Sequence, residues 1–420
     1  MSLDLEPALA SAPKRKTPHF HIHYSPRDAA GERTRGDGVR SEDLINAYAE
    51  ALEAAWTDLQ MLPKEVSHPS IAAPGVIQCV VTDVPEPVCS VVIRDEAIKP
   101  ILALPCCYPE LADWPAVLDM ARCSARHEPA HAWACRVWSE LWLGLDVLNS
   151  HRGIRQLLAE PAHWLSEGHA VALEAGNSPT GYWLQHASSW CDRPEISLFE
   201  EPYAAGFFAR YLDRRLGLKP GEVFSRAIST ITAPPQGPDR TVHNAQRLVW
   251  QALNRVLQPS LTAEEAWLES CRAGAFIGGS SLPADEEMAV FQRYGRRAVA
   301  DSFDLRINNP TISRPYLGSS LSCRYFSLTL PTSAKTIGLE AILAKATVSP
   351  RLRVGLWSET NAAVGAWLPS GQTDWLLPVK STEHSEHTRW TVVCALVPDD
   401  SGGESDSTWP ISWTLRLEAR

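Results

Sequence analysis

The pattern of hydrophobic and polar positions changes twice along the chain and divides it into three stretches. Up to about residue 110, short apolar runs surround one longer run of helical spacing. Helical spacing then dominates to about residue 302, and from residue 303 the apolar runs are short and rich in β-branched and aromatic residues. The sequence therefore predicts an α+β fold built from several domains.

The first stretch, residues 18–110, is predicted to form a small α+β unit behind a disordered tail at residues 1–17. Residues 19–24 alternate, so that three apolar side chains share one face of a strand and three histidines share the other. The other predicted elements are a helix at residues 41–62 and strands at residues 76–81, 90–93 and 101–104.

The second and third stretches are predicted to be a mostly helical subdomain, residues 111–302, and an antiparallel β-sandwich, residues 303–420. In the sandwich, short strands are separated by Gly, Pro, Ser and Asp. Thr262 and Glu265 form a capping box that predicts the start of the last helix. The predicted helices cover residues 115–148, 163–176, 203–216, 241–257 and 263–273.

Composition and charge argue against two classes of function, nucleic-acid binding and membrane insertion. The net charge is −10 and charges of both signs are mixed, whereas a nucleic-acid binder carries a basic surface. No apolar run approaches the roughly 18 residues that cross a bilayer, so we expect no membrane insertion. Ten cysteines without a CxxC pair are typical of reduced thiols in the cytoplasm. Export stays an alternative if a leader precedes residue 1.

The main candidate for chemistry is an HExxH motif formed by His127, Glu128 and His131. Residues four apart on a helix are about 6 Å apart along the axis, so both imidazoles can bind one ion. A zinc ion (Zn2+) lowers the pKa of its bound water to about 7, and a neighbouring carboxylate can accept the proton. The motif therefore predicts a zinc site with Glu128 as general base.

A third ligand is offered by the segment WLSEGHA at residues 164–170. With the HExxH motif before it, this segment resembles the gluzincin zinc metallopeptidases, particularly the aminopeptidase N and leukotriene hydrolase group, in which a helix reading like WLNEGFA supplies a glutamate ligand. The resemblance implies a thermolysin-like zinc domain, a peptide or protein substrate, and Glu167 as the ligand beside His127 and His131.

A further segment at residues 202–212 is similar to the part of that family that begins with the catalytic tyrosine and reads Tyr-x-x-Gly. The resemblance implies that Tyr203 donates a hydrogen bond to the oxyanion, a role that suits a neutral phenol. The specific match covers about residues 126–216. One strand near the site, at residues 90–93 or 101–104, is expected to bind substrate.

Three features depart from the family pattern. Pro129 lies inside the motif, and because a proline within a helix costs roughly 3 kcal/mol, we expect a helix break near residues 124–126. The gap between His131 and Glu167 is longer than in the aminopeptidases. The Gly-x-Met-Glu-Asn motif that binds a substrate amino terminus is absent from residues 64–126, so aminopeptidase activity is not implied.

Several alternatives remain open from the sequence. His151 and His163 are alternative third ligands, and the face formed by His19, His21 and His23 is a weaker metal candidate because a flat strand spaces its side chains widely. A stripe from Cys123 to Cys135 spans about 18 Å, too long for one ion. The alternative functions are a catalytically inactive, peptidase-like binding protein and a protein with a structural metal. The oligomeric state and endo- versus exopeptidase action do not follow from the sequence.

Overall fold

The computed structural model describes the chain in segments that form two compact units. The first unit contains residues 1–185 and 205–240, and the second contains residues 186–204 and 241–420. Both contain helices and β-sheet, which confirms the predicted α+β class. The described residues are 9, 14–26, 38–39, 41–60, 76–94, 97–108, 110–111, 113–142, 163–175, 190–231, 242–275, 299–305, 311–331, 336–343, 351–359, 365–369, 374–378, 387–398 and 411–419.

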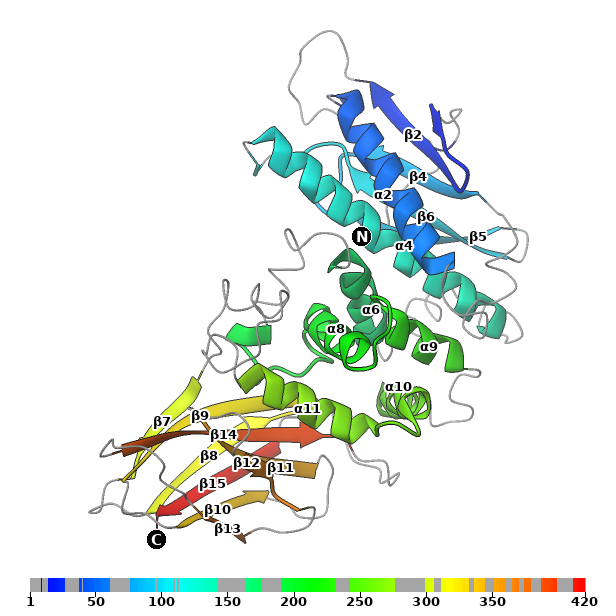
Figure 1. The fold of residues 1–420 in the computed structure, drawn as a ribbon. Helices are drawn as coiled ribbons and strands as arrows, with labels where there is room; N and C mark the ends of the chain where they lie inside the picture. Colours follow the sequence, from blue (N-terminus) through cyan, green and yellow to red (C-terminus); the bar gives the residue numbers. More distant parts are fainter. Residues whose placement is uncertain are drawn as a thin grey trace. The chain divides into compact units, whose positions relative to one another are not determined.

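The first unit is built on a mixed sheet with the strand order β1-β2-β4-β6-β5, with β3 paired to β2 (Figure 1). Strands β2, β4 and β6 run parallel, whereas β5 pairs antiparallel with β6 at the end of the order. The strand β1 lies within the tail that was predicted to be disordered, so ordered structure starts earlier than residue 18. The bounds are β1 Arg15–Lys16, β2 Phe20–Pro26, β3 Gly38–Val39, β4 Ile77–Thr82, β5 Val88–Arg94 and β6 Ala97–Pro105.

The described helices of the first unit pack on one another and on the sheet. Helix α2 packs against α4, α4 contacts β6 and α6, and α6 contacts both α8 and α9. The amphipathic pattern predicted every one of them except α9. Within the described ranges, no helix combines the length and apolar character needed to cross a membrane. The bounds are α2 Glu42–Gln60, α4 Trp114–Trp142, α6 His163–Ala175, α8 Ala205–Arg215 and α9 Glu222–Thr230.

A buried chain of hydroxyl groups ties α2, the end of β6 and α4 together. The Tyr48 hydroxyl on α2 donates to the carbonyl oxygen of Pro105 over 2.7 Å and lies 3.0 Å from the Tyr108 hydroxyl. Tyr108 in turn donates to Ser124 on α4 over 3.1 Å. Because buried polar groups are costly unless they are hydrogen-bonded, this series of hydroxyl groups restricts how α4 can rotate against the sheet.

Helix α4 corrects the prediction of a break near residues 124–126. It runs without interruption from Trp114 to Trp142 and contains Pro129 in its interior. The proline removes one backbone hydrogen bond, but its neighbours Ala125, Ala130 and Ala132 are all fully buried. Packing of the helix on α2, β6 and α6 therefore outweighs the local cost of the proline.

The second unit contains two sheets that share one apolar core. Their strand orders are β13-β10-β15-β8 and β12-β11-β14-β9-β7, and Phe326, Leu356, Trp413 and Leu415 are among the core residues that the two sheets supply. All described pairs are antiparallel except β7 with β9. The bounds are β7 Val299–Asp304, β8 Thr311–Gly318, β9 Ser322–Pro331, β10 Thr336–Leu343, β11 Arg351–Ser358, β12 Gly365–Trp367, β13 Asp374–Pro378, β14 His387–Val397 and β15 Ile411–Ala419.

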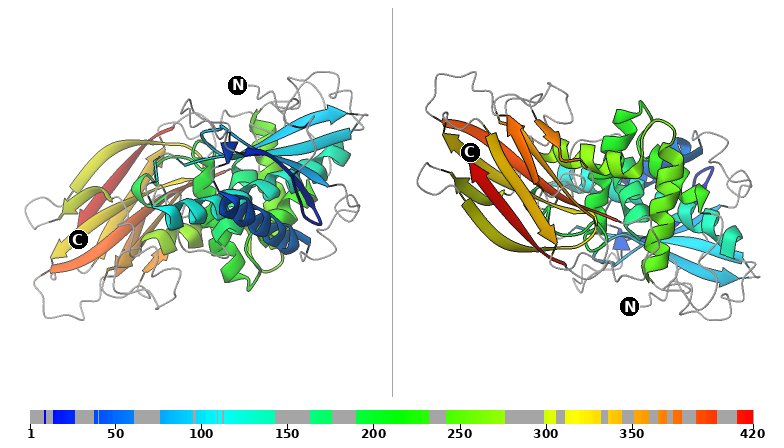
Figure 2. Two further views of the ribbon diagram at one scale, coloured as in Figure 1. Left: turned by 90° about the horizontal axis from the view of Figure 1, so that it is seen from above. Right: turned by 90° about the horizontal axis from the view of Figure 1, so that it is seen from below.

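The units divide the chain differently from the predicted boundary at residue 302. The second unit also contains the 3-10 helix η2 (Pro202–Ala204), α10 (Val242–Leu257) and α11 (Ala263–Ala275), which we had placed with the zinc-binding helices. Helix α11 contacts β14 and so packs on the five-stranded sheet of the second unit (Figure 2). The predicted capping box is confirmed, since Glu265 accepts hydrogen bonds from the backbone and hydroxyl of Thr262 over 2.9 and 2.8 Å.

Candidate metal centre

Two helices of the first unit, α4 and α6, bring the predicted metal ligands together. His127 and His131 lie one turn apart on α4, and their ring centroids are 4.8 Å apart. Glu167 comes from the neighbouring helix α6, 40 residues from His127 in sequence. Gly168 lets α6 lie close to its neighbours, because a Cβ atom there would come within 2.7 Å of Phe224 and 2.9 Å of Ala205.

Three atoms of these residues form a nearly equilateral triangle. The Nε2 atoms of His127 and His131 are 3.0 Å apart, and the Oε2 atom of Glu167 lies 3.1 Å from the first and 3.4 Å from the second. In a tetrahedral zinc site with bonds of about 2.0–2.1 Å, neighbouring ligand atoms are about 3.3 Å apart. The spacing therefore matches one face of a zinc coordination tetrahedron.

Each histidine has a polar partner on its other ring nitrogen, and both partners come from α6. His127 Nδ1 lies 3.4 Å from an oxygen of Glu174, and His131 Nδ1 lies 2.9 Å from the Ser166 hydroxyl. Metal-binding histidines usually donate their outward N–H to such a partner, which fixes the ring and leaves the other nitrogen free to bind. The arrangement therefore presents both Nε2 atoms to the same point.

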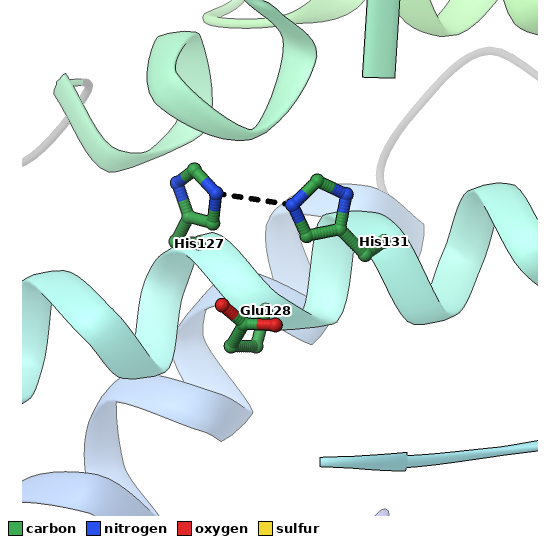
Figure 3. A group of neighbouring side chains, drawn as sticks. All are labelled: His127, Glu128 and His131. Atoms are coloured by element: carbon green, nitrogen blue, oxygen red, sulfur yellow. Dashed lines mark hydrogen bonds between the residues drawn. The ribbon is translucent and has the colours of Figure 1, made fainter. Parts of the chain in front are cut away.

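Glu128 leaves α4 in a different direction from the two imidazoles (Figure 3). A carboxylate oxygen still lies within 4.8 Å of a ring nitrogen of each histidine. The side chain is buried, and its Oε2 atom has no hydrogen-bond partner among the described residues. Burial raises the pKa of Glu128, although His131 and His127 act against that shift. A buried, unpaired carboxylate of raised pKa is suited to accept and return a proton.

The electrostatics of the centre favour a cation. Burial works to raise the pKa of Glu167, but the two histidines outweigh it and hold that pKa well below its usual range. Burial works to lower the pKa of His127, yet Glu167 and Glu174 leave it well above the usual value. Three buried carboxylates, those of Glu128, Glu167 and Glu174, thus lie in the neighbourhood of the two imidazoles. Because buried charges need compensation, this donor set fits a divalent cation.

The remaining predicted residues have different surroundings. His163 Nδ1 lies 3.5 Å from Oε1 of Glu167, the oxygen that points away from the triangle, and His151 lies outside the described residues. Tyr203 is in η2, is 36% exposed and belongs to the second unit, so its role at the metal centre stays a prediction. His19 binds Glu53 over 2.7 Å and His23 lies 2.9 Å from an oxygen of Gln78.

Sequence reasoning did not assign roles to Ser166, Glu174 or the buried His169. Glu174 carries a usable signal, because it follows Glu167 by seven residues, two helical turns, and so lies on the same face of α6. Ser166 precedes the ligand directly and carries no comparable signal. His169 faces α9 and lies 2.7 Å from the Ser225 hydroxyl, and burial lowers its pKa to about 3.

Comparisons with known proteins add little to this picture. No protein-family model matches the sequence, and a search of the curated proteins finds no match. Among solved structures, the chain is similar to a periplasmic inhibitor of g-type lysozyme, PliG of Aeromonas hydrophila. That match has 8% identity and a TM-score of 0.18, and covers 29% of this chain and all of the inhibitor. A TM-score of that size does not indicate a shared fold or function, so any functional assignment depends on the residues of the candidate site.

Proposed function

We propose that the chain is a zinc-dependent peptidase whose first unit is a thermolysin-like, gluzincin-type catalytic domain. The observation that carries the proposal is the triangle of His127 Nε2, His131 Nε2 and Glu167 Oε2, with edges of 3.0, 3.1 and 3.4 Å. Three ligand atoms with this spacing would lie on one side of a bound metal, and catalytic zinc sites use three protein ligands and keep the fourth position open. A structural site would need a fourth side chain.

His127, His131 and Glu167 hold the metal in this proposal. When bound, zinc supplies a Lewis acid that polarises a carbonyl group and brings the pKa of water close to 7. Glu128 accepts the proton of the attacking water and returns it to the leaving amine. Its burial, and the absence of a hydrogen-bond partner for its Oε2 atom among the described residues, leave the carboxylate available for both transfers. Tyr203 is proposed to donate to the oxyanion.

A peptide is the substrate class that the sheet favours. In the described part of the chain β5 pairs only with β6, so its other edge is available to an extended backbone, whereas β6 lies between β4 and β5. Helix α4 contacts β5, so the edge strand lies beside the metal helix. An extended peptide added to β5 would use the hydrogen-bonding groups of that edge. Of the two strands predicted from the sequence, we therefore choose the one at residues 90–93, which lies within β5.

The test is the variant Glu128→Gln, which keeps the size of the side chain but cannot accept the proton. It is expected to bind one zinc ion per chain and to lose at least about 100-fold in peptide cleavage, the scale of general-base catalysis. The control is Glu222→Gln on α9, because Glu222 is a buried glutamate of the same unit whose partners are Arg226 and the Lys219 backbone.

Three outcomes separate the alternatives. Undiminished cleavage by Glu128→Gln would refute the mechanism. A wild-type chain that binds no zinc would point to a catalytically inactive, peptidase-like binding protein. The third outcome is a wild-type chain that binds zinc but has no coordination position for a small exogenous ligand. The visible spectrum of the cobalt-substituted protein measures this, and the result would indicate a structural metal.

A further inference from the structure

Two thiols lie together beside the metal centre and have no part in the proposed reaction. Cys135 lies on α4, one turn beyond His131, and Cys89 lies on β5 opposite Leu102 of β6. The two side chains share a hydrogen bond. They are 46 positions apart in the sequence, so only the packing of α4 against β5 brings them together.

Both residues are only partly buried, unlike most cysteines of the chain. All ten cysteines are free, and seven are buried, whereas Cys89, Cys107 and Cys135 are only partly buried. Of these three, Cys107 shares a hydrogen bond with its direct neighbour Cys106 in the chain. Among the ten cysteines, Cys89 and Cys135 are therefore the only two that are both partly buried, share a hydrogen bond and come from two different elements.

The pair is also within electrostatic reach of the metal centre. The carboxylates of Glu128 and Glu167 act on Cys89, and His131 and Glu128 act on Cys135. The hydrogen bond from Cys89 lowers the pKa of Cys135, although burial works against that shift. Because the two side chains share a hydrogen bond, a sulfenic acid formed on one sulfur lies within reach of the other.

We propose that Cys89 and Cys135 are a reversible modification site, which hydrogen peroxide or a related hydroperoxide converts to a disulfide that links β5 to α4. The effect on turnover rests on the proposed function, because β5 is the proposed substrate strand and α4 carries His127, Glu128 and His131. Formation of the bond itself does not depend on the proposed function.

The chemistry needs one oxidant and balances in two steps. The Cys135 thiolate attacks one peroxide oxygen, the O–O bond breaks, and the second oxygen leaves as hydroxide and is protonated to water, which leaves a sulfenic acid. The Cys89 sulfur attacks that sulfenic sulfur, the S–O bond breaks and a second water leaves as the S–S bond forms. Two thiols lose two electrons, which reduce one peroxide to two waters. A dithiol such as dithiothreitol reverses the oxidation.

The bond must change the geometry of the site. A disulfide holds its sulfurs about 2.05 Å apart, closer than two hydrogen-bonded thiols, and it fixes the torsion angles between them, so we expect β5 and α4 to shift against each other. Cys135 is one helical turn from His131, so the shift reaches the metal ligands directly. Because a misplacement of about 1 Å can cost roughly 100-fold in rate, we expect oxidation to reduce turnover by at least about tenfold.

The test uses the full-length zinc-loaded protein, treated with hydrogen peroxide and then with dithiothreitol. Peptide mapping by mass spectrometry is expected to find a Cys89–Cys135 linked peptide that is 2 Da lighter than the two thiol peptides together, and to lose it on reduction. Turnover is expected to fall and then return. Cys89→Ser and Cys135→Ser should each abolish the linked peptide and the reversible loss, whereas Cys107→Ser should keep both.

The outcomes separate this inference from the proposed function. Absence of the linked peptide after treatment that oxidises other thiols, or an equal reversible loss in both serine variants, would overturn the inference. A linked peptide in a protein that never cleaves peptides would support the modification site and refute the peptidase. A linked peptide with unchanged turnover would overturn the effect on activity while the peptidase stands.

Discussion

At the scale of single residues, the outward ring nitrogens of the two histidines matter as much as the inward ones. Glu174 lies beside Nδ1 of His127, and Ser166 lies beside Nδ1 of His131, so each imidazole is oriented by a group on α6. Without these partners, the rings could rotate or take the wrong tautomer. The sequence motif names the rings, but the packing of α6 decides which nitrogen they present.

Loss of these partners should weaken metal binding. Glu174→Gln keeps an acceptor but removes the negative charge, and Ser166→Ala removes the hydrogen bond to His131. Each is expected to lower zinc affinity, by about 10- to 100-fold, the range known for such outer partners. A competition titration with a chromophoric chelator measures this. Affinities equal to that of the wild type in both variants would show that the α6 partners do not orient the rings.

Some of the candidate residues have a signal in the sequence and others do not. His127, Glu128 and His131 were predicted from the spacing of the HExxH motif, whereas Glu167 was predicted from the resemblance of its segment to a known family. Tyr203 was selected by resemblance alone, and its predicted role has not been tested. Cys89 and Cys135 carry no local signal, since their proximity results from a strand meeting a helix.

At the scale of elements, the close packing of α6 rests on one small residue. A side chain at position 168 would meet Phe224 at 2.7 Å and Ala205 at 2.9 Å, both on elements that have little room to move. Gly168→Ala should therefore destabilise the first unit by about 1–3 kcal/mol, the usual cost of overpacking, and displace Glu167. Urea unfolding and zinc titration measure the two effects, and unaltered values for both would contradict this packing argument.

The start of α9 gives a prediction about pH. The Asp213 carboxylate accepts hydrogen bonds from the backbone of Gly221 and Val223 over 2.6 and 3.0 Å, and burial raises its pKa from the ordinary 3.8 to about 7. The folded state therefore holds the proton more tightly than the unfolded chain. The contribution of Asp213 to stability is complete below about pH 4, falls as pH rises to about 7 and is then constant.

Asp213→Asn isolates that contribution, because asparagine does not titrate in this range. The free energy of unfolding of the variant, relative to the wild type, should increase between pH 5 and pH 8 by up to a few kcal/mol, on the order of 1.4 kcal/mol for each pKa unit. Urea unfolding of both proteins at the two pH values, with a chelator present, gives the difference. A difference that does not change with pH would mean that the carboxyl group titrates near its ordinary value.

Helices and strands were predicted correctly where the hydrophobic periodicity was strong. The predictions failed where tertiary packing outweighed a local sequence preference. The alternating and helical patterns located α2, β4, β6, α6 and the start of α4 to within a few residues, and the predicted end of α4 at residue 148 lies outside the described residues. The predicted break before Pro129 was wrong because the buried surface of α4 outweighs the lost hydrogen bond. Helix α9 was missed although it packs on α6 and positions the partner of His169.

At the scale of the whole molecule, the chain has two cores, and the proposed metal ligands all lie in the first unit. Phe326 is fully buried in the core of the second unit, with its ring 5.8 Å from that of Phe303 and 6.2 Å from that of Trp413. Phe326→Ala should cost about 3–5 kcal/mol of stability in that unit. Zinc stoichiometry should remain one per chain, as determined by elemental analysis.

Urea unfolding of this variant should separate into two transitions, because two cores need not unfold together. The transition of lower stability should move to lower urea, and the transition that depends on added zinc should stay in place. Loss of zinc binding together with the weakened second core would show that the two units fold as one.

The sequence by itself determined the α+β class and the main helices, and it predicted the residue types of a candidate metal site, because periodicity and motif spacing are local properties of the chain. Only the tertiary structure decided that Glu167 meets the two histidines, that α4 stays intact through Pro129, and that α10 and α11 belong with the C-terminal sheets. Each of these depends on which surfaces become buried together, and burial is a property of contacts between segments that are distant in sequence.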